Sequence, residues 1–161
     1  MVAIVMGVSG SGKTTIGRAL ARAAGGRFHD ADDFHSDVNI AKMRGGTPLS
    51  ELDREPWLRT LRECIDRWLE EPGLTVLACS ALTRRSRVLL GAGRPGVRLV
   101  FLRAPKAAIE ARMRGRDHFM PPSLLQSQFD ALEPPDDALV LDATAPPEIL
   151  VEQALACLGQ S

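Results

Sequence analysis

The chain has no tyrosine, and its aromatic residues make up only 4% of 161 residues. Few aromatic rings are therefore present to stack on nucleic-acid bases. Its 20 lysines and arginines balance its 20 aspartates and glutamates, so net charge does not draw it toward nucleic acid or an anionic membrane. We expect neither nucleic acid nor a membrane as a partner.

Long hydrophobic runs are also missing, and none approaches the length of a membrane-spanning helix. The first apolar run begins at Val2, so we expect no signal peptide. Three cysteines (Cys64, Cys79 and Cys157) are odd in number and far apart, which predicts small core residues in a reducing compartment rather than disulfides. These features predict a cytoplasmic protein, and the length predicts one domain over residues 1–161.

A complete phosphate-binding motif, G-x-x-x-x-G-K-[ST], occupies residues 7–14, between an apolar run and a helix-forming segment. Its glycines allow backbone N–H groups to surround an anion, and the start of the helix adds further free N–H groups. Lys13 is predicted to reach the terminal phosphates of ATP, and the Thr14 hydroxyl to bind Mg²⁺. The predicted nucleotide site comprises Gly7, Ser9, Gly10, Ser11, Gly12, Lys13, Thr14 and Thr15.

Short apolar runs alternate with segments of helical periodicity along the whole chain. Strands are predicted at 2–6, 27–30, 74–79, 97–102 and 138–142. Helices are predicted at 13–24, 54–70 (with Asp53 as its N-cap), 105–115 (starting at Pro105), 122–132 and 147–158. This alternation predicts an α/β fold in which a parallel five-stranded sheet is flanked by helices, with ligands beyond the carboxyl ends of the strands.

Acidic residues crowd the end of the second predicted strand, in residues 30–35. Because parallel strands end at the same edge of a sheet, this segment should face the phosphate-binding loop; a solvated acidic turn is the alternative. A kinase acting on a hydroxyl group needs a carboxylate to orient the acceptor and take its proton. Asp32 is predicted to be this base, Asp30 to join Thr14 at the metal, and His35 to contact the substrate.

Several specific segments occur in order along nearly the whole chain. They are Asp30-x-Asp32-x-x-His35-x-x-x-Asn39-x-x-Lys42-Met43-x-x-Gly46-x-Pro48-Leu49, Asp53-Arg54-x-Pro56-Trp57-Leu58, Cys79-Ser80-Ala81-Leu82, His118-Phe119-Met120, Leu124-Leu125-x-Ser127-Gln128-Phe129 and Leu132-Glu133-x-Pro135. Together they resemble the gluconokinase family of small P-loop sugar-acid kinases, of the thermoresistant gluconokinase type. The resemblance implies a P-loop NTPase fold of the nucleoside-monophosphate-kinase type, the cofactors ATP and Mg²⁺, and a homodimer.

The same resemblance implies the reaction, which is ATP-dependent phosphorylation of D-gluconate to 6-phospho-D-gluconate. It also implies substrate-binding roles for Ser80, His118 and Gln128. Arg54 and Arg87 are predicted to bind the substrate, and either could hold its carboxylate, because a guanidinium group can bind a carboxylate through two hydrogen bonds. The alternative for each is a surface arginine.

A short lid is predicted at about residues 112–121. Arg112 and Arg116 share a helical face, and Gly115 lies between them. Closure of such a lid would bring both arginines onto the ATP phosphates as catalytic cations and exclude water. The alternative is that these arginines only cap the helix dipole.

One stretch departs from the family pattern, since Thr83 and Ser86 stand where the family usually carries lysine and tyrosine. Nearby Arg84 and Arg85 are expected to project elsewhere on a helix. The departure leaves two alternatives open, which are another small-metabolite kinase of the same fold, such as a shikimate kinase, or a nucleotide-binding regulator with weakened catalysis.

Overall fold

A parallel sheet forms the centre of the computed structural model, which describes residues 1–115 and 122–159. Its strands are β1 (Val2–Met6), β2 (Arg27–Asp30), β3 (Thr75–Ala78), β4 (Val97–Arg103) and β5 (Leu139–Asp142). They lie in the order β2-β3-β1-β4-β5, and every neighbouring pair is parallel. The predicted five-stranded parallel sheet is confirmed, and each predicted strand limit lies within one residue of the observed one.

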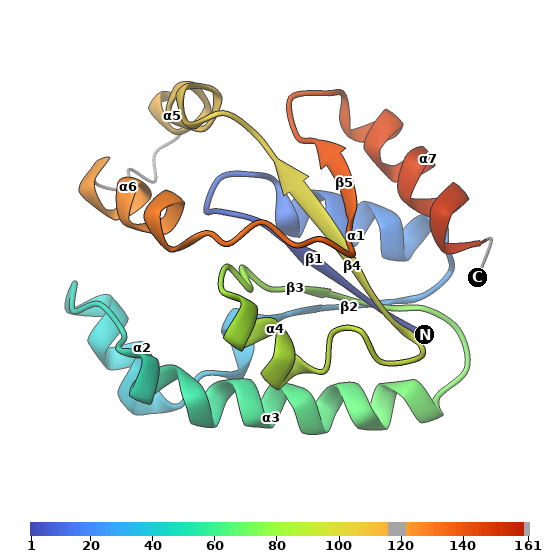
Figure 1. The fold of residues 1–161 in the computed structure, drawn as a ribbon, viewed down its shortest axis with the longest axis horizontal. Coiled ribbons are helices and arrows are strands. Elements are labelled where there is room, and N and C mark those ends of the chain that lie inside the picture. Colours follow the sequence, from blue (N-terminus) through green and yellow to red (C-terminus); the bar gives the residue numbers. More distant parts are fainter. Residues whose placement is uncertain (116–121, 160–161) are drawn as a thin grey trace.

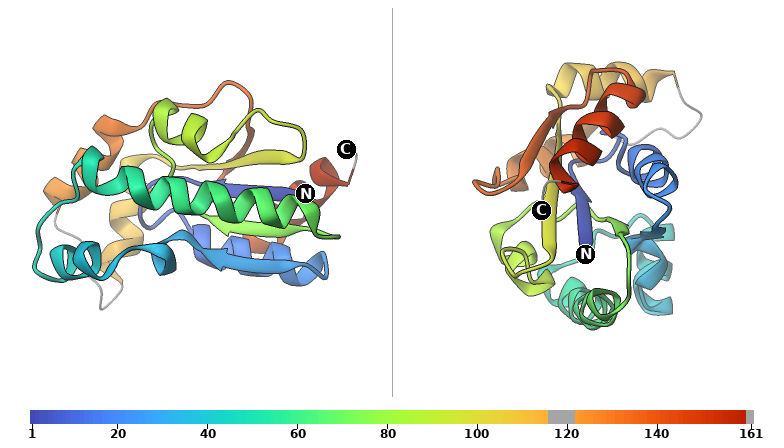
Figure 2. Two further views of the ribbon diagram at one scale, coloured as in Figure 1. Left: turned by 90° about the horizontal axis from the view of Figure 1, so that it is seen from below. Right: turned by 90° about the vertical axis from the view of Figure 1, so that its right-hand side faces the viewer.

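Helices cover both faces of this sheet (Figures 1 and 2). They are α1 (Lys13–Ala23), α2 (Asp37–Arg44), α3 (Glu51–Glu70), α4 (Arg84–Leu90), α5 (Lys106–Arg114), α6 (Pro122–Ala131) and α7 (Pro147–Leu158), together with a 3-10 turn η1 (Ala31–Phe34). The loop from β1 to α1 and the turn from β2 to η1 both leave the same edge of the sheet (Figure 1).

The central strand β1 is buried on both faces, because successive side chains of a strand point to opposite sides. Ala3 and Val5 belong to an apolar cluster with residues of α1, α5 and α7. Val2, Ile4 and Met6 belong to a second cluster with residues of α3 and α4. Burial on both faces explains why this strand reads as an uninterrupted apolar run in the sequence.

The long helix α3 begins earlier than its periodicity predicts. Ser50 is its N-cap, and the Ser50 hydroxyl accepts a hydrogen bond from the backbone N–H of Asp53 at 3.1 Å. The Asp53 carboxylate in turn accepts one from the backbone N–H of Ser50 at 3.0 Å. Prediction of Asp53 as the N-cap was therefore wrong, because Asp53 is the reciprocal partner within a capping box three residues further on.

Two further helix starts differ from the sequence prediction. Helix α2 was not predicted, because its apolar residues Val38 and Met43 are exposed rather than gathered on a buried face. The Ser36 hydroxyl caps it by accepting the backbone N–H of Asn39 at 3.2 Å. Pro105 lies one position before the first residue of α5, as its N-cap, rather than inside the helix.

The cysteines divide into two groups. Cys64 and Cys79 are buried as predicted, but Cys157 is exposed on the final helix, so its assignment to the core was wrong. Within the described ranges, no helix is both long and apolar enough to cross a membrane.

Candidate active site

The phosphate-binding loop connects β1 to α1 and depends on glycine at particular positions. Gly10 and Gly12 have φ angles of 81° and 99°, in the left-handed region that side chains with a Cβ rarely adopt. Gly7 is close to its neighbours, because a Cβ there would lie 2.8 Å from the Leu102 carbonyl oxygen. The loop therefore curls tightly at the amino end of α1, where free backbone N–H groups can bind an anion.

Lys13 reaches back into this loop from the first position of α1. Its Nζ donates a hydrogen bond to the Val8 carbonyl oxygen at 3.0 Å. Burial lowers the pKa of the Lys13 ammonium group, while the negative charges of Asp32 and Asp30 act to raise it. The lysine is thus a desolvated cation held within the loop and close to acidic side chains.

Thr14 and Asp30 meet as the sequence predicts. The Thr14 hydroxyl donates to Asp30 Oδ2 at 3.1 Å, and Asp30 Oδ1 accepts the backbone N–H of Asp32 at 3.0 Å. This second bond caps η1 and fixes the acidic turn against the loop. A hydroxyl and a carboxylate placed together in this way suit Mg²⁺, which takes oxygen ligands and uses few protein side chains beside phosphate and water.

Asp32 contrasts with Asp30 because its carboxylate has no hydrogen-bond or ion-pair partner among the described residues. Burial raises the pKa of the Asp32 carboxyl, and the neighbouring Asp30 charge raises it further. A carboxylate that is partly desolvated and close to another negative charge is a stronger base than a fully hydrated, isolated one.

His35 lies flat against Trp57, with ring centroids 4.2 Å apart and an interplanar angle of 14°. The Trp57 Nε1 donates to the Ala31 carbonyl oxygen at 2.7 Å, which anchors η1 to α3. Burial lowers the pKa of the His35 imidazole, so it is largely neutral at neutral pH. Trp57 has no predicted role in the sequence analysis, although its position three residues after Arg54 places both on one face of α3.

These residues surround a cavity of about 550 Å³ at the carboxyl edge of the sheet. The predicted site residues that line it are Ser9, Gly10, Gly12, Lys13, Thr14, Thr15, Asp30, Asp32, His35, Arg54, Ser80 and Gln128. Met43 of α2 and three residues of α6 also line it, and these helices lie at the same end of the molecule in Figure 1. The buried Cys79 also borders the cavity, and burial raises the pKa of its thiol to about 12, so it stays protonated at neutral pH.

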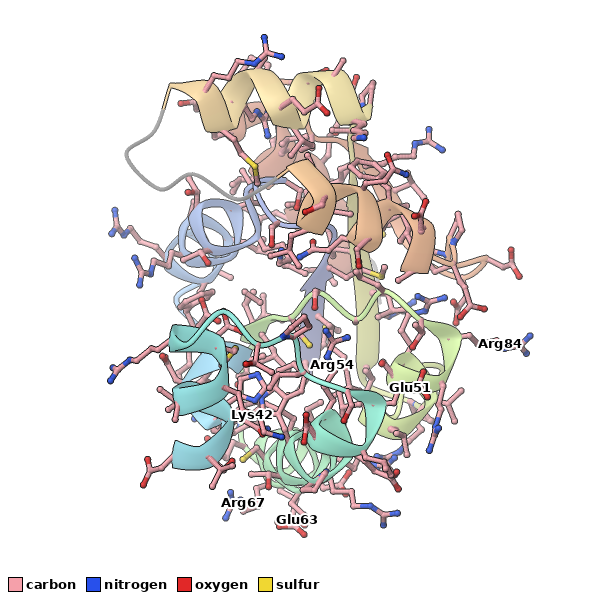
Figure 3. All side chains as sticks on the ribbon, turned by 90° about the vertical axis from the view of Figure 1, so that its left-hand side faces the viewer. Lys42, Glu51, Arg54, Glu63, Arg67 and Arg84 are labelled. Atoms are coloured by element: carbon pink, nitrogen blue, oxygen red, sulfur yellow. The ribbon has the colours of Figure 1, made fainter. Side chains whose placement is uncertain are left out.

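Arg54 and Lys13 are the cationic side chains at the cavity wall in the described part of the chain. Arg54 has no acidic partner there, and its side chain lies toward the middle of the molecule in Figure 3, whereas Arg84 points away. Arg85 is paired with Glu51 and Glu55. Neither Arg84 nor Arg85 therefore adds a further cation to the cavity.

Arg87 does not lie where the sequence prediction placed it. It is buried away from the cavity wall, with 6% of its surface exposed. Its guanidinium group donates to three backbone carbonyl oxygens, those of Ala81 at 2.9 Å, Leu82 at 3.0 Å and Glu133 at 2.7 Å. These bonds occupy the group that was expected to hold a substrate carboxylate.

Arg112 is likewise occupied by backbone oxygen atoms. Its guanidinium group donates to Gly10 at 3.4 Å, to Ser11 at 3.3 Å and also to Ala143. It is therefore placed beside the phosphate-binding loop rather than in the cavity wall. Arg116 and His118 lie outside the described residues, as does most of the predicted lid, so their roles stay predictions.

Gln128 lines the cavity but its amide group binds the loop. Its Oε1 accepts the backbone N–H of Ser9 at 2.7 Å, and its Nε2 donates to the Ser9 hydroxyl at 3.0 Å. The Ser80 carbonyl oxygen accepts the backbone N–H of Gly7 at 3.3 Å, which joins the end of β3 to the same loop. Ser11 is buried, and its hydroxyl has no partner within the described residues.

Comparisons with known proteins place the chain in a family. The family model of the AAA domain matches residues 2–135. A gluconokinase of Arabidopsis thaliana is 39% identical to the chain, over 99% of this chain and 93% of that protein. The chain belongs to the gluconokinase family.

Solved structures of proteins with similar sequences have the same fold as this chain. A sugar kinase from Janibacter sp. HTCC2649 is 48% identical and superposes with a TM-score of 0.87, covering 98% of this chain and 94% of the other. A gluconokinase from Sinorhizobium meliloti 1021 is 40% identical with a TM-score of 0.85, covering 99% and 91%. A shikimate kinase from Aquifex aeolicus, at 20% identity and a TM-score of 0.60, shares the P-loop kinase fold alone.

The departure from the family pattern falls on the cavity wall. Thr83 and Ser86 both line it, and the Thr83 hydroxyl donates to the Ser86 hydroxyl at 2.9 Å. Two small hydroxyl side chains thus stand where the pattern has a cation and a large aromatic ring.

Proposed function

We propose that this protein transfers the γ-phosphoryl group of ATP to the 6-hydroxyl of D-gluconate and so forms 6-phospho-D-gluconate. The observation that carries the proposal is one cavity that unites three complementary groups. These are the loop lysine Lys13, the carboxylate of Asp32 and the guanidinium group of Arg54, and the last two have no ion-pair partner within the described residues. The first suits the phosphates, the second a hydroxyl acceptor, and the third an acidic substrate.

The loop supplies the donors for the nucleotide phosphates. Backbone N–H groups at the amino end of α1 and the Lys13 ammonium group would neutralise charge on the phosphate oxygens. Thr14 and Asp30 would hold Mg²⁺ through the hydroxyl and carboxylate oxygens that already lie together. When bound, the ion withdraws negative charge from the phosphate oxygens during transfer. Within the described residues, no cluster of three acidic, histidine or cysteine side chains forms a separate metal site.

Asp32 would act as the general base. The acceptor oxygen forms a bond to the γ-phosphorus while the bond from that phosphorus to the departing ADP oxygen breaks, and the acceptor proton passes to Asp32. The raised pKa of Asp32 favours this transfer, because a base is most effective when its pKa is close to the working pH.

Arg54 would bind the gluconate carboxylate, since a guanidinium group offers paired donors that match two carboxylate oxygens. His35 and Ser80, which both line the cavity, would contact the hydroxyl groups of gluconate. Gln128 would act on the nucleotide side, because its amide already holds Ser9.

An acceptor panel tests this function directly. ADP release would be measured with D-gluconate, other aldonic acids and shikimate, with Lys13→Ala protein as the background control. We expect D-gluconate to give the highest kcat/KM, and ³¹P NMR to locate the phosphate on the 6-oxygen. Faster turnover of another acceptor would identify a different small-molecule kinase, and tight ATP binding without any turnover would indicate a regulator.

A homodimer and a cytoplasmic location complete the proposal. The family relationship supports both, and the balanced charge supports an absence of nucleic-acid binding. Light scattering of the purified protein and fractionation of the cells that produce it would measure the first two.

A further inference from the structure

The turn after β3 has an unusual backbone conformation at the cavity wall. Ser80, Ala81 and Leu82 line the cavity, and Ala81 has a φ angle of 45°. Among the described residues, Ala81 is the one non-glycine position with a positive φ. Such a conformation persists only where surrounding contacts impose it, and in many proteins it accompanies a functional site.

Arg87 supplies those contacts. Its Nη1 donates to the carbonyl oxygens of Ala81 and Leu82, at 2.9 Å and 3.0 Å, so one end of the guanidinium group holds both sides of the turn. Its Nη2 donates to the Glu133 carbonyl oxygen at 2.7 Å. A planar fork of several donors suits three fixed carbonyl oxygens, whereas a lysine ammonium group lacks this geometry.

The other end of this arrangement is also fixed. The Leu82 carbonyl oxygen accepts the backbone N–H of Glu133 at 2.8 Å, and the Glu133 carboxylate accepts the backbone N–H of Arg84 at 3.2 Å. Residue 133 follows α6, whose Gln128 holds Ser9 of the phosphate-binding loop. The turn, the end of α6 and the loop therefore form one connected frame around the cavity.

The turn touches the loop directly as well, through the bond from the Gly7 N–H to the Ser80 carbonyl oxygen at 3.3 Å. A shift of the turn would thus move the acceptor side of the cavity relative to the phosphate side. Transfer of a phosphoryl group is sensitive to this spacing, because the attacking oxygen must be aligned with the leaving oxygen.

We infer that Arg87 is a positioning residue for the acceptor, which acts through the Ser80–Leu82 turn and never touches the substrate. This inference rests on the proposed function for its kinetic consequences. A positioning role differs from a purely structural role in its kinetic effect. Loss of Arg87 should impair the use of D-gluconate and leave the binding of ATP nearly unchanged.

The test begins with Arg87→Lys, which keeps the positive charge but loses the planar guanidinium group and its paired N–H donors. We expect kcat/KM for D-gluconate to fall ~10²-fold, the loss that a displacement of about 1 Å in a reacting group can cause. The dissociation constant of ATP, measured by titration, should stay within about twofold. Arg84→Lys on the same helix is the matched control, because its side chain points away from the cavity (Figure 3), and it should behave as the unchanged protein.

Chemical rescue provides the second measurement. Millimolar guanidinium should restore part of the D-gluconate turnover of Arg87→Ala without changing that of Arg84→Lys. Gluconate kinetics left unchanged in a folded Arg87→Lys protein would overturn the inference. Equal losses for ATP and D-gluconate would also overturn it, and so would a folded Arg87→Ala protein that guanidinium fails to rescue.

Hydrogen exchange separates this inference from the proposed function. In Arg87→Lys, the amides of Glu133 and Gly7, which donate to the Leu82 and Ser80 carbonyl oxygens, should exchange faster than in the unchanged protein, whatever the acceptor is. If the unchanged protein fails to phosphorylate D-gluconate but this exchange still increases, the proposed reaction is wrong and the positioning role stands. Unchanged exchange at these amides would overturn the positioning role itself.

Discussion

Replacing Asp32 with asparagine should nearly abolish catalysis without damaging the fold. The Asp32 carboxylate has no hydrogen-bond partner among the described residues, so an amide of the same shape leaves no donor without its acceptor. Loss of a general base lowers a rate by ~10²–10⁴-fold. At about 1.4 kcal/mol per factor of ten, the activation barrier should rise by ~3–5 kcal/mol.

The same substitution should raise stability at neutral pH. Burial, and then the Asp30 charge, hold the pKa of Asp32 above its usual value in the folded state. Between the unfolded and folded pKa values the folded protein binds more protons, so the free energy of unfolding falls as the pH rises through that window. Asparagine carries no charge and avoids this loss. The free energy of unfolding of Asp32→Asn should therefore exceed that of the unchanged protein at neutral pH, and the difference should vanish below the ordinary aspartate pKa of about 3.9.

Three measurements check these expectations. They are ADP release with saturating substrates, titration with ATP, and urea unfolding at neutral and acidic pH. Asp33→Asn is the matched control, since Asp33 is the next residue of the same turn but does not line the cavity. Turnover of Asp32→Asn close to that of the unchanged protein, or an inactive Asp33→Asn, would refute the assignment. A lower unfolding free energy at neutral pH would refute the electrostatic reasoning.

Three other substitutions follow from the same geometry. Lys13→Ala should keep the fold and lower kcat ~10²–10³-fold, as loss of one preorganised cation does; a folded variant with ordinary turnover would contradict the site. Trp57→Phe removes the donor to the buried Ala31 carbonyl oxygen and should cost ~1–3 kcal/mol in urea unfolding, with a larger change in KM for D-gluconate than for ATP. Ala81→Gly relieves ~1–2 kcal/mol of left-handed strain against ~0.4–1 kcal/mol of added chain entropy, so its melting temperature should not fall. A clearly lower melting temperature would show that the turn is not strained.

Local patterns were sufficient to predict most of the fold. The strands alternate with helices as expected, because runs buried on both faces and segments of helical period can be recognised without knowing their partners. The start of α3 was misplaced, since the capping box of Ser50 and Asp53 lies before the apolar stripe begins. Helix α2 was not predicted, because it is stabilised by capping and by tertiary contacts rather than by an apolar face. One such contact is the Asn39 side-chain amide, which donates to the Asp53 carbonyl oxygen at 2.9 Å.

By itself, the sequence determined the phosphate-binding loop and its meeting with the acidic turn. Both depend on backbone geometry over a few neighbouring residues and on parallel strands that end at one edge, so Lys13, Thr14 and Asp30 could be placed together. The tertiary structure alone decided what the remaining polar side chains do. Arg87 and Gln128 carry groups that suit a substrate, yet Arg87 binds backbone carbonyl oxygens on both sides of the cavity turn and at Glu133, and Gln128 binds Ser9 of the phosphate-binding loop. Long side chains reach partners that any residue can provide, because every residue has a backbone carbonyl, and only the folded arrangement selects among them.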